Sequence, residues 1–137
     1  MSDNIQSLWG ELPEIDNSSR TPLQILREQA AIITKLTSGA LKGKVSKMTT
    51  TNPSSFAYSL FIEAPSLGSY TVRVVDVVYP LEMFPLRLVD AVASVGRECA
   101  TEDELIAALR GVLQSEKLRK LISALIVQVR GAQAMPA

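Results

Sequence analysis

Histidine is absent from the 137 residues of this chain, and Cys99 is its one cysteine. The lack of histidine removes serine–histidine and cysteine–histidine dyads, together with the commonest transition-metal ligand. One cysteine cannot supply the tetrahedral ligand set of a structural zinc site. The seven glycines are scattered and form no phosphate-binding loop of the Walker or dinucleotide type. We therefore expect neither a metal ion nor a cofactor.

Cys99 is the remaining candidate for covalent chemistry. It lies two residues before Thr101, where a helix is predicted to start, and a helix N-terminus can favour the thiolate. Cysteine is also among the residue types most often buried, so a structural thiol is the competing interpretation. An enzyme or thiol carrier that uses Cys99 is one function that the sequence allows.

Carboxylates are numerous in the second half of the chain, but their spacing pairs none of them as a general acid and base. The acids at 102–104 fit the first turn of a helix, where they stabilise the helix dipole. Asp76 differs because it interrupts an apolar run, where a buried charge would need a partner. We expect Asp76 either to face outward at a sheet edge or to pair with Arg73 or Lys47.

Lys42, Lys44 and Lys47 form a basic cluster on a predicted strand. They could contact nucleic-acid phosphates, although no aromatic platform or glycine-rich loop accompanies them. The chain has 14 basic and 14 acidic residues, so no overall field attracts a polyanion. The sequence therefore favours a solvated strand face over a nucleic-acid contact.

The strands that must position these residues are clearest in the middle of the chain. Apolar and polar side chains alternate over residues 56–63 and 70–79, as in half-buried strands. The segment 64–69 contains proline and glycine and predicts a hairpin between them. A short strand is predicted at 86–89. An earlier strand at 40–48 has lysines on one face, which fits a sheet edge.

Helices are predicted on both sides of these strands. Thr21 and Thr101 each precede a glutamine or glutamate by three residues, which is the pattern of a capping box. Apolar residues at helical spacing follow both, and the second stripe ends near Gln114. Ser115 is a cap for a last helix that Gly131 should close, unless the two join into one bent helix.

This order of elements predicts an α+β fold. We expect an antiparallel meander of three or four strands, covered by an N-terminal helix and two C-terminal helices. Residues 90–100 carry no pattern that decides between a helical turn and an irregular segment. The length fits a single domain, placed at 21–131 between a polar arm at 1–20 and a tail at 132–137 that should fray.

Nothing in the sequence indicates export or a membrane. No basic segment leads into an apolar run near the start, and no stretch reaches the roughly 18 apolar residues that a spanning helix needs. One cysteine excludes an internal disulfide and fits a reducing compartment. We expect a cytoplasmic protein that does not contact a membrane.

The arm at residues 1–20 is acidic and carries isolated apolar residues, among them Trp9. In one interpretation Trp9 docks on the core of its own domain. In the other it is an aromatic anchor for a partner protein. Met83 and Phe84, in the turn after the second long strand, are further candidate contacts because methionine and aromatic residues are favoured at interfaces.

At Tyr79-Pro80 and the following strand, the chain resembles the ubiquitin-conjugating enzymes and their non-catalytic relatives, the RWD domains. These share an N-terminal helix, an antiparallel meander, a Tyr-Pro element with a second proline, a short strand and C-terminal helices, an order similar to that of residues 21–131. Here Pro85 comes one residue later than the usual spacing. Cys99 lies downstream as the conjugating cysteine does, but the supporting His-Pro-Asn segment is missing. The resemblance therefore implies a binding module.

The sequence thus favours a small non-enzymatic protein that binds another protein, as an adaptor, a chaperone-like partner, or an immunity or inhibitor protein. Its candidate contact residues are Trp9, Tyr79, Met83 and Phe84. Two alternatives stay open: a thiol-dependent carrier or conjugating-type enzyme using Cys99, and a nucleic-acid contact through the three lysines. A homodimer also stays open, because the sheet edge and the last helix could both be shared.

Overall fold

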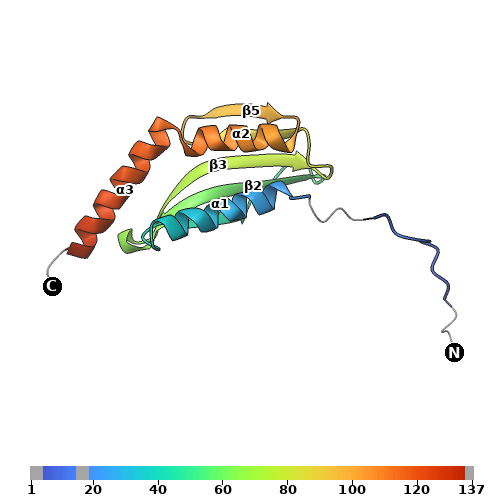
Figure 1. Ribbon diagram of the computed structural model, residues 1–137, viewed down its shortest axis with the longest axis horizontal. Coiled ribbons are helices and arrows are strands. Elements are labelled where there is room, and N and C mark those ends of the chain that lie inside the picture. Colours follow the sequence, from blue (N-terminus) through green and yellow to red (C-terminus); the bar gives the residue numbers. More distant parts are fainter. Residues whose placement is uncertain (1–4, 15–18, 135–137) are drawn as a thin grey trace.

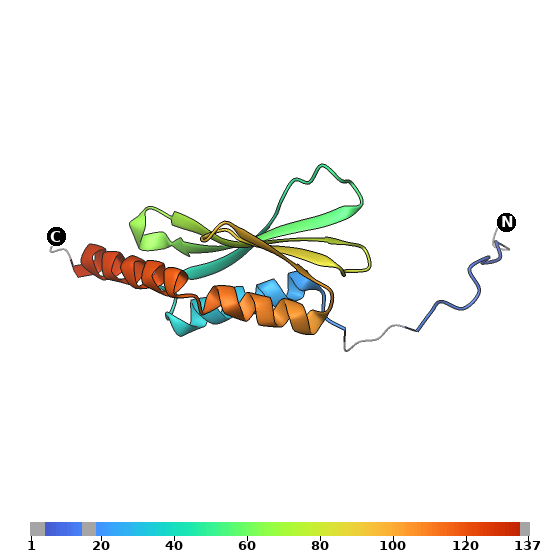
Figure 2. The same cartoon turned by 90° about the horizontal axis from the view of Figure 1, so that it is seen from above.

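The computed structural model describes residues 5–14 and 19–134. Figure 1 shows α1 and α2 lying along the sheet, with α3 continuing beyond the end of α2, and Figure 2 shows these helices on one side of the sheet. In chain order the elements are α1 (Pro22–Leu36), β1 (Lys42–Lys47), β2 (Ser55–Ala64), the short 3-10 helix η1 (Pro65–Leu67), β3 (Tyr70–Pro80), β4 (Leu86–Asp90), β5 (Val95–Cys99), α2 (Glu102–Leu113) and α3 (Glu116–Ala134).

In the described part of the chain, five antiparallel strands form one sheet in the order β1-β2-β3-β4-β5. The predicted α+β class with an antiparallel meander is confirmed. The predicted number of three or four strands is wrong, because β5 is a fifth strand in the segment 90–100. Only Cys99 of β5 is buried, so this edge strand shows no apolar alternation. The side-chain oxygen Oδ1 of Asp90 accepts hydrogen bonds from the backbone N–H groups of Val92 and Ala93, and these bonds stabilise the turn between β4 and β5.

A β-bulge in β3 changes which side chains share a face. Leu60 lies opposite Val75 but Phe61 lies opposite Arg73, so Val74 is an extra residue. Val74 and Val75 are both fully buried in the core. In a regular strand, side chains an odd number of residues apart point to opposite faces. The extra residue of the bulge reverses this rule for pairs of residues that lie on either side of it. Side chains three residues apart across the bulge therefore reach the same face.

Helix α1 is fixed at its start by local hydrogen bonds and along its length by close packing. The backbone N–H of Gln24 donates to Thr21 Oγ1 over 3.1 Å, and the N–H of Thr21 donates to Gln24 Oε1 over 2.8 Å, which confirms the capping box. On the sheet below, Gly43 of β1 lies so close that an added Cβ would be 2.3 Å from the carbonyl oxygen of Ala30. Only glycine permits this approach of strand and helix.

α2 and α3 are two separate helices and not one bent helix. Thr101 Oγ1 accepts from the N–H of Glu104 over 3.2 Å, and Ser115 Oγ accepts from the N–H of Leu118 over 3.3 Å. Leu105 and Leu109 of α2 and the inner face of α3 join one apolar core with the sheet. The prediction that Gly131 closes the last helix is wrong, because α3 continues to Ala134.

The described part of the arm, residues 5–14, lies clear of the domain (Figures 1 and 2). The side chain of Trp9 is 84% exposed. The interpretation in which Trp9 docks on the core is therefore wrong. Residues 5–14 of the arm form no helix or strand that would pack Trp9 against the domain.

Candidate functional site

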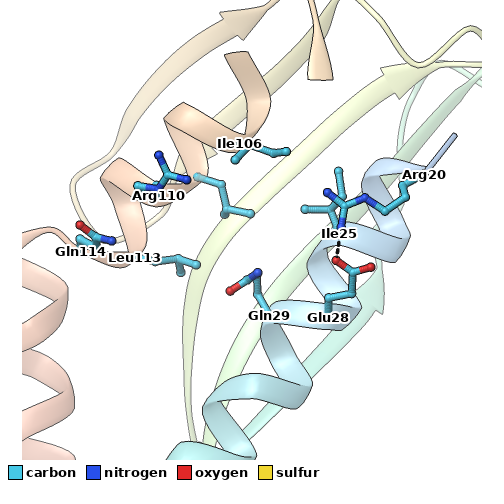
Figure 3. Close-up of a pocket in the computed structure, with 9 residues that line it drawn as sticks. Arg20, Ile25, Glu28, Gln29, Ile106, Arg110, Leu113 and Gln114 are labelled. Carbon is cyan, nitrogen blue, oxygen red and sulfur yellow. Dashed lines mark hydrogen bonds and ion pairs between the residues drawn. The ribbon is translucent and has the colours of Figure 1, made fainter. Parts of the chain in front are cut away.

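A groove opens between α1 and α2 on the helix-covered side of the sheet. Its first part is a cavity of about 230 Å³. Figure 3 shows Ile25 and Gln29 on α1 facing Ile106 and Leu113 on α2 across the gap. The complete lining is Arg20, Ile25, Glu28, Gln29, Ile106, Leu109, Arg110, Leu113 and Gln114.

The groove exists because the two helices pack on opposite halves of the sheet. α1 packs on β1 and β2, whereas α2 packs on β4 and β5. α1 buries Leu26 and Ala30 toward its strands, and α2 buries Leu105 and Ala108 toward its own. The strip of sheet between the helices is therefore left to form the bottom of a groove.

A second cavity of about 170 Å³ adjoins the first, since Gln29 and Leu113 line both. Its bottom is made by Leu60, Ile62 and Val74 of the sheet, and its walls come from α1, α2 and α3. We call the two cavities together the helix groove. The wall residues of this second part are Gln29, Ile32, Ile33, Leu36, Leu113, Leu118 and Ile122.

The charges of the helix groove lie at one end. Arg20 forms an ion pair with Glu28 and approaches Glu102 to 4.0 Å. Within residues 5–14 and 19–134, the side chain of Arg110 forms no hydrogen bond or ion pair, so it is a free cation there. The other end is apolar, with Ile32 45% and Leu36 76% exposed. The second cavity of the groove is thus largely apolar, whereas the first cavity also has the charged side chains of Arg20, Glu28 and Arg110.

Asp76 is buried on the side of the sheet that carries no helix, which we call the open face. Its carboxylate accepts from Arg73 Nη2 over 2.6 Å and from the hydroxyl of Ser59. Ser59 and Asp76 are 1% and 4% exposed. The expected pairing with Arg73 is confirmed, although β3 is a central strand and not an edge. Each carboxylate oxygen thus accepts a hydrogen bond from a neighbouring side chain, which satisfies the buried charge.

Cys99 is fully buried in the apolar core, opposite Leu86 of β4. Burial raises the pKa of its thiol, the carboxylate of Glu104 raises it further, and Arg97 lowers it. Removal from water thus outweighs any stabilisation of the thiolate by the nearby helix start. This environment opposes the use of Cys99 as a nucleophile.

The three lysines do not form one patch. β1 is an edge strand, as expected, and Lys42 and Lys44 point to its open face. The ammonium of Lys44 pairs with Glu63 over 3.0 Å, which neutralises part of the cluster. Lys47 lies opposite Tyr58 in the register and therefore points to the other face. The arrangement does not gather the positive charge that a polyanion would require.

Tyr79 is a buried residue and not an exposed anchor. It is 6% exposed, and its ring lies 5.6 Å from that of Phe56 and 6.2 Å from that of Tyr58. Burial raises the pKa of its hydroxyl, as does Tyr58, while a hydrogen bond with the backbone of Leu23 lowers it. Met83 and Phe84 are half-buried in the following turn. Met83 lines a shallow pocket beside Tyr79, whereas Phe84 does not.

Sequence reasoning missed the helix groove. The signal was present in α1, where Ile32 and Leu36 widen the apolar stripe beyond what the sheet buries. A second missed signal lies in the arm, where Ile5, Leu8, Trp9 and Leu12 follow the spacing of one helix face. Neither signal shows by itself what would cover these residues.

No protein-family model, curated protein or solved structure matches this chain. Among residues 5–14 and 19–134, no three histidine, cysteine, aspartate or glutamate side chains gather as a metal site would need. The same residues contain no helix with the length and apolar character to cross a membrane.

Proposed function

We propose that this protein is a non-enzymatic protein-binding module whose N-terminal arm carries the contact motif. The observation that supports this is the exposure of the arm's large apolar side chains. Ile5, Leu8, Trp9 and Leu12 are 87%, 96%, 84% and 73% exposed. Clustered exposed apolar residues mark interaction sites, and tryptophan is enriched among the residues that dominate binding energy.

The arm has the features of a segment that becomes ordered on binding. Its four apolar residues are spaced to form one stripe if the segment turns helical, but Gly10 and Pro13 weaken a helix in isolation. Gly10 has a φ of 66° in the described arm, outside the helical range. Such a segment gives up conformational freedom only when a partner covers its apolar side chains.

The chemistry of the domain favours binding over catalysis. Cys99 is buried with a raised thiol pKa, which disfavours the thiol-dependent alternative. The chain has no histidine to activate a nucleophile. The order of one helix, an antiparallel meander and C-terminal helices supports the proposed likeness to the non-catalytic RWD domains, and that likeness itself implies a protein contact. We also place the protein in the cytoplasm, since one cysteine fits a reducing compartment.

A pull-down with purified full-length protein tests this function. We expect the Leu8→Ala/Trp9→Ala variant to lose at least about tenfold of its bound partner, because hot-spot side chains carry most of the binding energy. Val127→Ala is the matched control, since Val127 is 65% exposed on α3, away from the arm. A partner bound equally by all three proteins would refute the role of the arm, and repeated absence of any partner or self-association would refute the function.

A further inference from the structure

One chain presents both an uncovered apolar segment and an uncovered apolar groove. The segment is the described arm, residues 5–14, which lies clear of its own domain (Figures 1 and 2). The groove is the helix groove, whose rim residues Ile32 and Leu36 are 45% and 76% exposed. Resting on the proposed function of the arm, we propose that two copies of this chain exchange arms, each arm lying in the helix groove of the other copy.

The two surfaces have the same length. Helix α1, which forms one wall of the groove, has 15 residues. At a rise of about 1.5 Å per residue it is about 22 Å long. The arm from Ile5 to Leu12 covers seven residue steps, or about 23 Å when extended. An extended arm therefore spans the groove, with Ile5 and Trp9 directed to one wall and Leu8 and Leu12 to the other.

The order of chemical character along the arm also matches the groove. Ile5, Leu8 and Trp9 come first in the arm, and Glu11 and Glu14 lie on either side of Leu12 near its C-terminal end. The groove is apolar beside Leu36, and the free guanidinium of Arg110 lies in its first cavity, away from Leu36. An arm that places Ile5 beside Leu36 brings its acidic end to Arg110. Glu28, the acid in the lining, is already paired with Arg20.

The direction in which the arm leaves the domain favours a second copy over its own groove. α1 runs back along the sheet from Pro22, whereas the described arm lies beyond the Pro22 end of that helix, away from the sheet (Figure 1). Arg20 ties the base of the arm to Glu28 at the mouth of its own groove. Exchange between two copies is an isologous contact that closes with two-fold symmetry, so both grooves and both arms become covered.

The buried area is close to that of a stable dimer. A large aromatic side chain buries about 150–250 Å², so the four apolar residues of one arm bury roughly 500 Å² in total. Two arms alone then bury roughly 1,000 Å², and the exposed rims of the two grooves bring the total near the roughly 1,200 Å² at which specific stable interfaces begin.

Trp9 is the only tryptophan, so its fluorescence reports directly on whether the arm is buried. We expect the full-length chain to be a dimer by light scattering, with blue-shifted emission that turns red on dilution. Leu36→Glu should place a charge against the apolar start of the bound arm and weaken dimerisation at least about tenfold, because an unpaired charge that becomes buried is costly. Since Leu36 is 76% exposed, the substitution leaves the fold intact. Val127→Glu, at a site that is 65% exposed and outside the groove, should remain dimeric.

A mixing experiment isolates the contact between arm and groove. The Trp9→Ala chain has an intact groove and no tryptophan, while the Leu36→Glu chain has an intact arm and a damaged groove. Titrating the first into the second should shift the emission of the Leu36→Glu chain to the blue. The Trp9→Ala/Leu36→Glu double variant should produce no shift.

Three outcomes would overturn the exchange. A monomer with exposed Trp9 at high concentration shows that the arm does not bind this groove, and the proposed function then survives if a different partner still depends on Leu8 and Trp9. A blue-shifted monomer shows that each arm occupies its own groove. A dimer that persists in both Trp9→Ala and Leu36→Glu shows that another surface joins the copies.

Discussion

The two faces of the sheet are built on different principles. The centre of the helix-covered face is apolar, and α1 and α2 remove its leucine and valine side chains from water. The open face has no helix, yet Ser59 and Asp76 are as buried as the core. There each buried side-chain polar atom of the described residues has a hydrogen-bond partner. The comparison teaches that apolar area stabilises one face, while on the other a polar network fixes which residues are neighbours.

The largest expected effect concerns the helix-covered face. Leu105→Ala removes a side chain that is 1% exposed between α2 and the sheet. We expect the free energy of unfolding to fall by about 3–4 kcal/mol, because the loss of apolar burial adds to the cost of a cavity. Urea denaturation measures this change. Val127→Ala is the control and should cost less than about 0.5 kcal/mol, since Val127 is 65% exposed and lies outside the helix groove. Equal losses would contradict the boundary of this core.

The second-largest expected loss of stability comes from the close packing of β1 against α1 on the same face. Gly43→Ala would place a methyl group 2.3 Å from a backbone oxygen of α1, which has little room to move. We expect a loss of about 2–3 kcal/mol, as in other overpacked sites. Gly111→Ala is the matched control, because no atom lies within 4 Å of its added Cβ and alanine favours a helix. If thermal unfolding places both variants at the same midpoint, the close approach of α1 and β1 is wrong.

On the open face we expect a smaller loss. Arg73→Ala removes the cation beside the buried carboxylate of Asp76 and leaves Ser59 as its side-chain donor. The cost should be about 1–2 kcal/mol, below that of a fully buried pair because the Arg73 side chain is 51% exposed. Lys44→Ala breaks a more exposed pair on the same face and should cost less than about 1 kcal/mol. Denaturant midpoints that rank these two variants in reverse would contradict the polar network.

The smallest effect is the pH dependence from Cys99. Its pKa is higher in the folded chain than in the unfolded chain, so the folded state keeps the proton longer as pH rises. Stability is therefore complete below the unfolded thiol pKa and falls as pH rises above it toward the folded value. Urea midpoints at neutral and alkaline pH should show a steeper decline for the native chain than for Cys99→Ala.

Thiol labelling gives an independent check of the same burial. A thiol reagent should modify Cys99 quickly in urea and slowly in the folded chain, since the thiolate is the reactive form and burial suppresses it. Rapid labelling of the folded chain would show that Cys99 is accessible, and it would revive the thiol-dependent alternative.

Some of this structure could be predicted because the determining interactions are local. The capping residues Thr21 and Thr101 start α1 and α2 through hydrogen bonds that span three residues. The alternation of apolar and polar side chains predicted β2 and β3, and the lysines of β1 predicted that it lies at an edge of the sheet. Strand β5 could not be found this way, because an exposed edge strand needs only a neighbouring backbone and carries no apolar alternation.

By itself the sequence determined the fold class, the helix starts and the absence of histidine chemistry, since each depends on residue type and short-range spacing. Tertiary structure alone decided the rest. Whether Cys99 is buried depends on α2 covering it, and the pairing of Arg73 with Asp76 depends on the bulge at Val74. The helix groove depends on α1 and α2 packing on opposite halves of one sheet. Such outcomes arise from contacts between segments far apart in the chain, which no local pattern encodes.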